Sequence, residues 1–309
     1  MAPLHLNTPL LRAPPELVGE RTVWLKMDVL QPGGSFKMRG VGRLVQRLVA
    51  EGARAVVCAS GGNAGMAATL AAHACGVPAT IVVPETTSSA VCEALRARGA
   101  TVVLHGAVFD QAQVHAVALA QATQAAFVHP FDHPLLWEGH ASLIDEVVQA
   151  GVDFDAVVVS VGGGGLLAGV IEGLRRNGLA QVPVVAVETE GAASLAAALA
   201  AGRLVTLPAI SSVASSLAAR TVAAQVLALA REHEIVSVTV SDAQAVDACS
   251  RFLDTMRVLV EPACGASIAA LDAHPALFAR FKAPLVEVCG GMGVSLARLT
   301  AWRRDLGLD

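Results

Sequence analysis

The chain has 309 residues, of which 54% are hydrophobic and 16% carry a charge, so the sequence predicts a large buried core. The net charge of -4 and the lack of a basic cluster argue against a nucleic-acid partner. No apolar run reaches the length of a membrane span without a glycine, a proline or a polar residue, so no membrane partner is expected.

Six cysteines are scattered along the chain, and none of them forms a CxxC pair. This usage predicts buried free thiols in a reducing, cytoplasmic compartment and argues against a disulfide framework or a zinc site. The cysteines are Cys58, Cys75, Cys92, Cys249, Cys264 and Cys289.

Short β-branched runs alternate with helical patterns along the chain. The runs that predict strands are residues 24–27, 55–59, 79–84, 101–104, 156–161, 182–187, 235–240 and 283–289. The patterns that predict helices are residues 37–48, 64–75, 88–98, 109–123, 166–177, 194–201, 218–231, 243–252 and 294–306. This alternation is typical of an α/β fold with a mostly parallel sheet.

A lysine stands at the start of the first long helical pattern. Lys37 follows a turn made by Gly33, Gly34 and Ser35. The helix dipole disfavours a cation in the first turn, which favours loss of the lysine proton. A neutral lysine can form a Schiff base with an aldehyde. The plain alternative is a solvated lysine at a helix start.

Four consecutive glycines follow the strand at residues 156–161. Gly162, Gly163, Gly164 and Gly165 free the backbone to approach a ligand closely, and their N–H groups at a helix start attract an anion. The pattern is neither GxGxxG nor a P-loop, because no Lys-Ser/Thr pair follows it. It predicts a phosphate site, and a tight turn is the alternative.

Two further glycine-rich turns join a predicted strand to a helix. The turn at residues 60–65, Ser-Gly-Gly-Asn-Ala-Gly, offers N–H groups, a hydroxyl and an amide suited to a carboxylate, although Asn63 could simply cap the helix. The turn at residues 289–291 begins with Cys289, for which a buried structural thiol is the alternative role. His129, His133 and His140 share one polar segment, but their spacing matches no standard metal-ligand pattern.

Five motifs occur together, in order, over nearly the whole chain: residues 35–40 (SFKMRG), 60–65 (SGGNAG), 162–165 (GGGG), 261–266 (EPACGA) and 289–291 (CGG). Jointly they resemble the fold-type II pyridoxal-phosphate (PLP) enzymes. Within these, the chain is similar to the short, liver-type L-serine/L-threonine dehydratases and the serine dehydratase-like proteins.

The resemblance implies a role for each matching residue. Lys37 would carry PLP as a Schiff base and act as the proton-transfer base. The residues implied to contact the cofactor are Phe36, Asn63 (ring 3-oxygen), Gly162, Gly163, Gly164, Gly165 and Leu166 (phosphate), and Cys289 (ring nitrogen). Those implied to bind the substrate carboxylate are Ser60, Gly61, Asn63 and Ala64. Those implied to supply oxygens to a monovalent cation, K⁺, are Glu188, Ala192, Leu217 and Ala219.

The implied reaction is α,β-elimination of water from L-serine or L-threonine, which yields pyruvate or 2-oxobutyrate and ammonia. A thiol is a weak proton donor, so Cys289 would leave the ring nitrogen largely neutral. Serine racemases resemble this chain but place a serine at the position of Gly61, so we expect elimination with little racemisation.

The resemblance also implies a tryptophan synthase β-like architecture of two lobes, each a mostly parallel sheet flanked by helices. We expect residues 1–33 and 131–309 to form the large PLP-binding domain and residues 34–130 the small domain, with the cofactor between them. A cytoplasmic homodimer with an amino-acid substrate is expected.

Two alternatives stay open. One is another β-elimination or replacement enzyme of the same fold, such as a cysteine synthase, a threonine synthase or a D-amino-acid lyase. The other is a non-catalytic protein that binds a phosphorylated ligand through residues 162–165.

Overall fold

The computed structural model describes residues 2–308. Its contacts divide the chain into two compact units, which we describe separately. The small unit comprises residues 2–6 and 31–139, and the large unit comprises residues 7–30 and 140–308. The domain boundaries expected from the sequence, at 33/34 and 130/131, stay a prediction.

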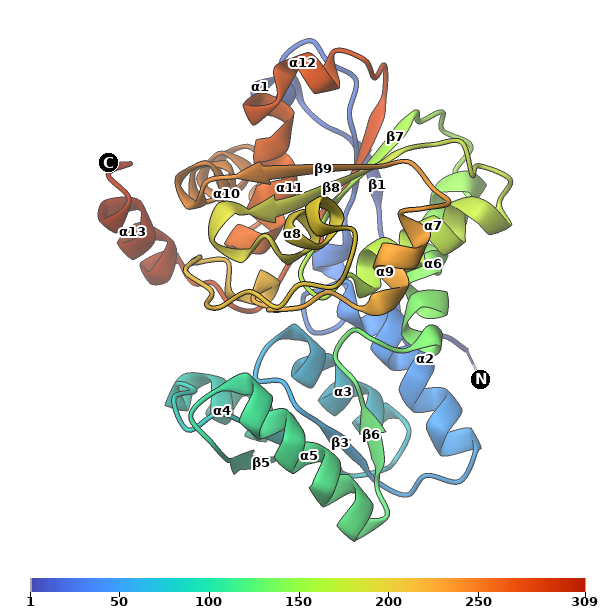
Figure 1. The fold of residues 1–309 in the computed structure, drawn as a ribbon, viewed down its shortest axis with the longest axis vertical. Coiled ribbons are helices and arrows are strands. Elements are labelled where there is room, and N and C mark those ends of the chain that lie inside the picture. Colours follow the sequence, from blue (N-terminus) through green and yellow to red (C-terminus); the bar gives the residue numbers. More distant parts are fainter. Residues whose placement is uncertain (1, 309) are drawn as a thin grey trace. The chain divides into compact units, whose positions relative to one another are not determined.

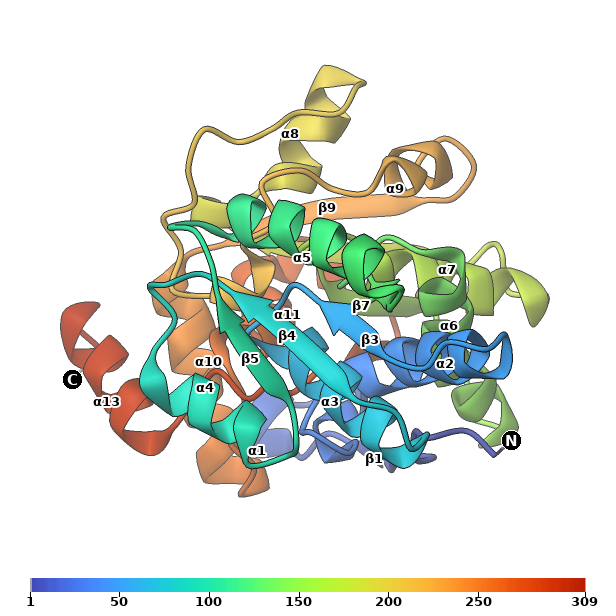
Figure 2. The same ribbon diagram turned by 90° about the horizontal axis from the view of Figure 1, so that it is seen from below.

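The small unit is built on a four-stranded parallel sheet of order β5-β4-β3-β6 (Figure 1). Its elements are α2 (Lys37–Ala50), β3 (Val56–Cys58), α3 (Asn63–Ala74), β4 (Ala79–Val83), α4 (Ser89–Arg96), β5 (Thr101–Leu104), α5 (Phe109–Thr123) and β6 (Ala126–Val128). Figure 2 shows α5 over one face of this sheet and α3 and α4 over the other. The central strands β3 and β4 are almost wholly buried, as expected for a parallel sheet covered on both faces.

The large unit is built on a six-stranded sheet of order β1-β2-β10-β7-β8-β9, in which only the β1–β2 pairing is antiparallel among the described residues. Its strands are β1 (Leu10–Arg12), β2 (Trp24–Lys26), β7 (Ala156–Ser160), β8 (Val184–Thr189), β9 (Ile235–Val240) and β10 (Pro284–Glu287). Its main helices are α7 (Gly165–Arg176), α8 (Ser194–Ala201), α9 (Ala224–Leu229), α10 (Asp242–Met256), α11 (Pro262–Ala273) and α13 (Leu296–Asp305). The short helices α1 (Pro15–Val18) and α12 (Pro275–Phe278) complete the unit, and α6 (Pro134–Gln149) begins in the small unit and ends in this one.

The expected strand–helix alternation is confirmed, and one expected helix is wrong. Residues 218–231 were expected to be helical throughout, but the helix there is only α9. The segment before it is not helical, because its backbone groups bond elsewhere. The N–H of Leu207 donates to the carbonyl of Arg220 (2.8 Å), and the N–H of Ala223 donates to the carbonyl of Gly163 (3.0 Å). These long-range bonds override the helical propensity of the alanines.

Six of these strands and helices had no counterpart in the expectation: β1, β6, α1, α6, α11 and α12. Helix α11 is buried over almost its whole length, so its sequence has no polar face that would mark a helix. The thiol expectation is confirmed for five of the cysteines, which are buried and free, whereas Cys75 is partly exposed.

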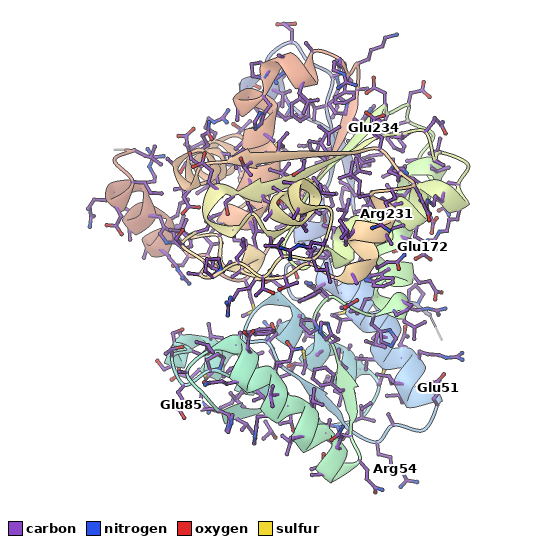
Figure 3. The ribbon with its side chains drawn as sticks, viewed as in Figure 1. Glu51, Arg54, Glu85, Glu172, Arg231 and Glu234 are labelled. Carbon is purple, nitrogen blue, oxygen red and sulfur yellow. The ribbon has the colours of Figure 1, made fainter. Side chains whose placement is uncertain are left out.

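Charged side chains lie mainly on the surface, as Figure 3 shows for Glu51, Arg54 and Glu85. Among the described residues, no helix is both long and apolar enough to cross a membrane.

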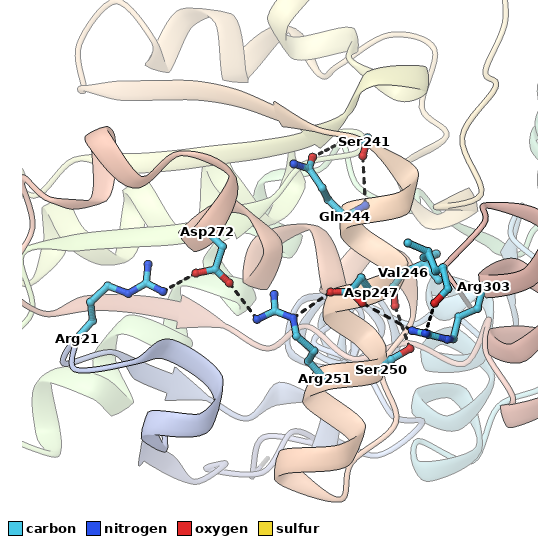
Figure 4. A network of polar contacts seen from close by, with 10 residues as sticks. Arg21, Ser241, Gln244, Val246, Asp247, Ser250, Arg251, Asp272 and Arg303 are labelled. Atoms are coloured by element: carbon cyan, nitrogen blue, oxygen red, sulfur yellow. Dashed lines mark hydrogen bonds and ion pairs between the residues drawn. The ribbon is translucent and has the colours of Figure 1, made fainter.

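A chain of ion pairs connects helices on the surface of the large unit (Figure 4). Asp272 contacts Arg21 (2.5 Å) and Arg251 (3.0 Å), while Asp247 contacts Arg251 (3.1 Å) and Arg303 (3.7 Å). The side chains of Asp272 and Arg251 are 45% and 36% exposed, so each pair contributes only about 0–1 kcal/mol. The pairs therefore connect α10, α11 and α13 but add little to the stability of the fold.

One ion pair of the large unit is buried. The amine of Lys26 lies 2.6 Å from the carboxylate of Glu146, and the two side chains are only 1% and 8% exposed. The same amine donates to the carbonyl of Thr8 (2.6 Å). Removing one partner of such a pair leaves a buried charge without its counter-ion.

We therefore expect Glu146→Ala to lower the free energy of unfolding by about 3 kcal/mol. Urea unfolding followed by circular dichroism measures the change. Glu51→Ala is the matched control, because its pair with Arg47 is over half exposed and should contribute less than about 0.5 kcal/mol. Equal losses in the two variants would contradict the assignment of a structural role to the buried pair.

Candidate active site

Lys37 is the first residue of α2, as the sequence predicts. The turn before it contains Gly33 and Gly34, which have φ values of +80° and +76° that favour glycine. The Lys37 amine donates a hydrogen bond to the carbonyl of Pro130 (2.7 Å) and lies 5.0 Å from the centre of the Phe36 ring. The amine is therefore held against the protein, which argues against the plain alternative of a solvated lysine.

The turn at residues 60–65 joins β3 to α3. A Cβ atom on Gly65 would lie 1.8 Å from the carbonyl oxygen of Ser60, so only glycine allows this close approach. The Ser60 hydroxyl accepts the N–H of Gly62 (3.2 Å). Asn63 is buried and is the first residue of α3 rather than its cap, since Gly62 occupies the cap position. The capping alternative for Asn63 is thus wrong.

Gly61 and Ala64 complete this turn. A Cβ atom on Gly61 would lie 3.2 Å from Val83 Cγ1 and 3.3 Å from Thr87 Cγ2. Any side chain at Gly61 would therefore need small shifts of these neighbours. Ala64 is buried.

The four glycines join β7 to α7 in the large unit. Gly164 has φ of +87° and is the N-cap of α7, and its Cβ would lie 2.4 Å from Val226 Cγ2. A Cβ on Gly162 would lie 3.0 Å from the carbonyl oxygen of Ser216. Gly165 and Leu166 form the first turn of α7, where backbone N–H groups have no helical acceptor. Close packing therefore requires glycine at residues 162 and 164, and the N–H groups at the helix start are suited to an anion such as a phosphate group.

Cys289 follows the end of β10 and is buried. A hydrogen bond with the Cys264 thiol, burial, and the carboxyl groups of Glu287 and Glu261 raise the pKa of Cys289 well above its usual value. The side chain is therefore a neutral thiol. A neutral thiol is compatible with an uncharged ring nitrogen. The same burial is also compatible with the alternative role of Cys289 as a structural thiol.

Glu261 is part of one of the motifs, although no role is predicted for it from the sequence. Its carboxylate accepts the N–H of Gly293 (3.0 Å), and a Cβ on Gly291 would lie 1.9 Å from its carboxyl carbon. Glu261 thus shapes the turn after Cys289. The signal in the sequence is a carboxylate directly before the proline that starts α11.

The residues expected to surround a cation lie near the ends of elements in the large unit: Glu188 in β8, Ala192 after it, and Leu217 and Ala219 in the loop before α9. The Glu188 carboxylate accepts the N–H groups of Leu195 (2.7 Å) and Ala196 (2.8 Å) at the start of α8. The Leu217 carbonyl accepts the N–H of Ala219 (2.8 Å). The cation stays a prediction.

Burial raises the pKa of Glu188 to about 7, while the hydrogen bonds from the start of α8 lower it. The folded state then holds this proton more tightly than the unfolded state. The resulting stabilisation is complete below the ordinary pKa of 4.5 and is lost as the pH rises through about 7.

Glu188→Gln should therefore reduce the loss of stability between pH 5 and pH 8 by about 2 kcal/mol, according to the usual conversion of a pKa shift. Urea unfolding at a series of pH values measures it. Glu190→Gln, which alters an exposed neighbour, is the control and should keep the slope of the original protein. A slope unchanged in Glu188→Gln would contradict the raised pKa.

Comparison with known proteins gives three relevant similarities. The chain is 47% identical to human "L-serine dehydratase/L-threonine deaminase", over 99% of this chain and 97% of the human chain. It is 49% identical to mouse "Serine dehydratase-like", over 99% of this chain and 96% of the mouse chain. The crystal structure of a fungal L-serine ammonia-lyase from Rhizomucor miehei superimposes with a TM-score of 0.92 at 36% identity, covering 98% of this chain and 99% of the fungal chain.

The family described as "Pyridoxal-phosphate dependent enzyme" matches residues 1–290 of the chain. The fold of both units, the lysine at the start of α2 and the glycine turn at the start of α7 agree with that match. The chain therefore belongs to the family of pyridoxal-phosphate-dependent enzymes, and its α/β fold is of type II.

Proposed function

We propose that this protein is a PLP-dependent L-serine/L-threonine ammonia-lyase that eliminates water to give pyruvate or 2-oxobutyrate and ammonia. The observation that supports it most is the match of fold and length to relatives that bear this activity in their names, at 47% identity. The positions of Lys37 and of the glycine turn at the start of α7 are consistent with it.

The bound cofactor supplies an aldehyde that takes up the substrate amino group and a ring that withdraws electrons from Cα. Lys37 would hold the cofactor aldehyde, beside Phe36 and with Asn63 donating to the ring 3-oxygen. The backbone N–H groups of residues 162–166 would bind the phosphate, because a helix start favours an anion.

The chain's own groups then act on the substrate. The turn at Ser60, Gly61, Asn63 and Ala64 would bind the carboxylate and fix the orientation of Cα. The Lys37 amine would remove the Cα proton, for which its neutral form is required. The neutral Cys289 thiol would leave the ring nitrogen unprotonated, which favours prompt loss of the β-hydroxyl group.

We also propose that the protein is a cytoplasmic homodimer. It would bind K⁺ near Glu188, Ala192, Leu217 and Ala219. Buried free thiols are typical of a reducing compartment. Sedimentation of the purified protein gives the oligomeric state, and activity with and without K⁺ reports on the cation.

The purified protein should absorb in the visible range through its Schiff base, and L-serine should change that spectrum while pyruvate and ammonia appear. Borohydride reduction followed by peptide mass mapping should place the adduct on Lys37. Lys37→Ala should lower kcat by about a thousandfold or more, because the proton-transfer group is gone.

The same experiment separates the alternatives. Release of pyruvate from D-serine alone, or turnover of O-acetylserine alone, would favour another enzyme of the same fold, and formation of D-serine would favour a racemase. A colourless protein without a borohydride adduct would favour a non-catalytic phosphate-binding protein.

Gly164→Ala should weaken PLP binding by about tenfold or more, since the new methyl group meets Val226 and the backbone must leave its left-handed conformation. Absorbance titration of the cofactor-free chain measures the affinity. Gly202→Ala is the matched control, because Gly202 has a similar φ of +63° but no atom within 4 Å of its Cβ position. Unchanged affinity in Gly164→Ala would contradict the phosphate site.

A further inference from the structure

The loop after β6, residues 129–133, contacts the amine of Lys37 within the small unit. The Pro130 carbonyl accepts a proton of that amine at 2.7 Å, from a position 93 residues further along the chain. Pro130 is buried and Lys37 is partly buried, so this contact is partly shielded from water. The acceptor belongs to the main chain, and its direction depends on what holds the loop.

His129 holds the same peptide from its other side. Its Nδ1 atom accepts the backbone N–H groups of Phe131 (3.3 Å) and Asp132 (2.8 Å). The carbonyl of Pro130 and the N–H of Phe131 belong to one planar peptide and point in opposite directions. A ring that holds the N–H therefore aims the carbonyl, and the carbonyl is bonded to Lys37.

The imidazole ring is itself fixed in place. Its centre lies 6.1 Å from the Phe127 ring and 4.8 Å from the Phe131 ring, edge to face in both cases. Its Nε2 atom lies 3.4 Å from the side-chain nitrogen of Gln113 on α5, a packing contact in which both nitrogens carry protons. Because Nδ1 accepts two N–H groups, the ring proton is on Nε2 and the ring is neutral.

Charged and titratable groups face this ring from several elements. Burial lowers the pKa of His129, the charges of Lys37 and His133 lower it further, and Asp132 raises it. Cys58, at the end of β3, faces Lys37 as a neutral thiol because burial raises its pKa to about 12. The surroundings thus favour a neutral imidazole.

We propose that His129 is a positioning residue for proton transfer at Lys37: its neutral ring aims the Pro130 carbonyl, which holds the lysine amine in place whenever that amine is released from the cofactor. The inference rests on the proposed function, in which Lys37 is both the anchor of the cofactor and the base. Protonation of Nδ1 would replace the acceptor with a donor and release the loop. Activity should then fall as the pH drops through the His129 pKa.

Two substitutions separate positioning from a general structural role. His129→Leu puts an apolar side chain in place of the ring, and this side chain accepts no hydrogen bond. His129→Asn keeps an oxygen that can accept the N–H two residues further on, as asparagine does in turns, and this oxygen does not titrate. Melting temperatures of the holoenzymes show whether both variants fold.

In the holoenzyme, His129→Leu should lower kcat by about tenfold to a hundredfold with KM within about threefold, the scale expected for a misplaced reacting group. His129→Asn should restore kcat to within about threefold and abolish the loss of activity at acidic pH. If His129→Leu does not fold, the pH profile of His129→Asn alone decides.

A second readout does not depend on turnover. Competitive acylation of the cofactor-free, full-length chain, read by peptide mass spectrometry, compares the reactivity of Lys37 with that of exposed Lys282. The ratio of Lys37 acylation to Lys282 acylation should change by more than about threefold in His129→Leu, which corresponds to a change in the Lys37 pKa on the order of a fraction of a unit. In His129→Asn the ratio should return to that of the original protein.

The outcomes distinguish the inference from the proposed function. Unchanged Lys37 reactivity in His129→Leu, or an acidic limb retained by His129→Asn, would overturn the role of His129 whatever the enzyme's substrate. Altered Lys37 reactivity in a chain that releases no ammonia from any amino acid would support the role of His129 and overturn the lyase.

Discussion

At the strand–helix turns of both units, the main chain lies so close to neighbouring atoms that only glycine fits. Both units depend on this constraint. In the small unit, a Cβ on Gly65 would lie 1.8 Å from a carbonyl oxygen of its own turn. In the large unit, a Cβ on Gly164 would lie 2.4 Å from a methyl group of Val226. Both turns follow the carboxyl end of a parallel strand, where α/β proteins bind ligands. Because glycine has no side chain, the N–H groups at these helix starts remain accessible to anions.

Burial gives the remaining polar groups their chemical character. Burial raises the pKa of the Cys58 thiol, and a hydrogen bond with Cys264 together with burial raises the pKa of Cys289, so both thiols are kept neutral. The imidazole of His129 is kept neutral by the same physical effect, acting on a cation instead of an anion. In each unit, burial thus keeps these groups uncharged next to a turn that leads into a helix start, where an anion is favoured.

Positions in the site are then set by supports that are distant in sequence. The turn after Cys289 is shaped by the Glu261 carboxylate, which accepts the N–H of Gly293. The amine of Lys37 is held by the Pro130 carbonyl, whose peptide is in turn held by His129. In both cases a side chain accepts main-chain N–H groups and thereby fixes the position of a turn or loop.

The sequence by itself determined the local features: the alternation of strands and helices, the glycine turns at strand ends, and Lys37 as the first residue of α2. These depend on propensity and spacing over a few residues, which are readable in one segment at a time. Only the tertiary structure decided that residues 218–223 are not helical, that the almost wholly buried α11 is a helix, and that the Pro130 carbonyl, in a loop held by His129, contacts the amine of Lys37. The physical reason is that each of these features depends on hydrogen bonds or burial contributed by residues far away along the chain, and no local pattern records them.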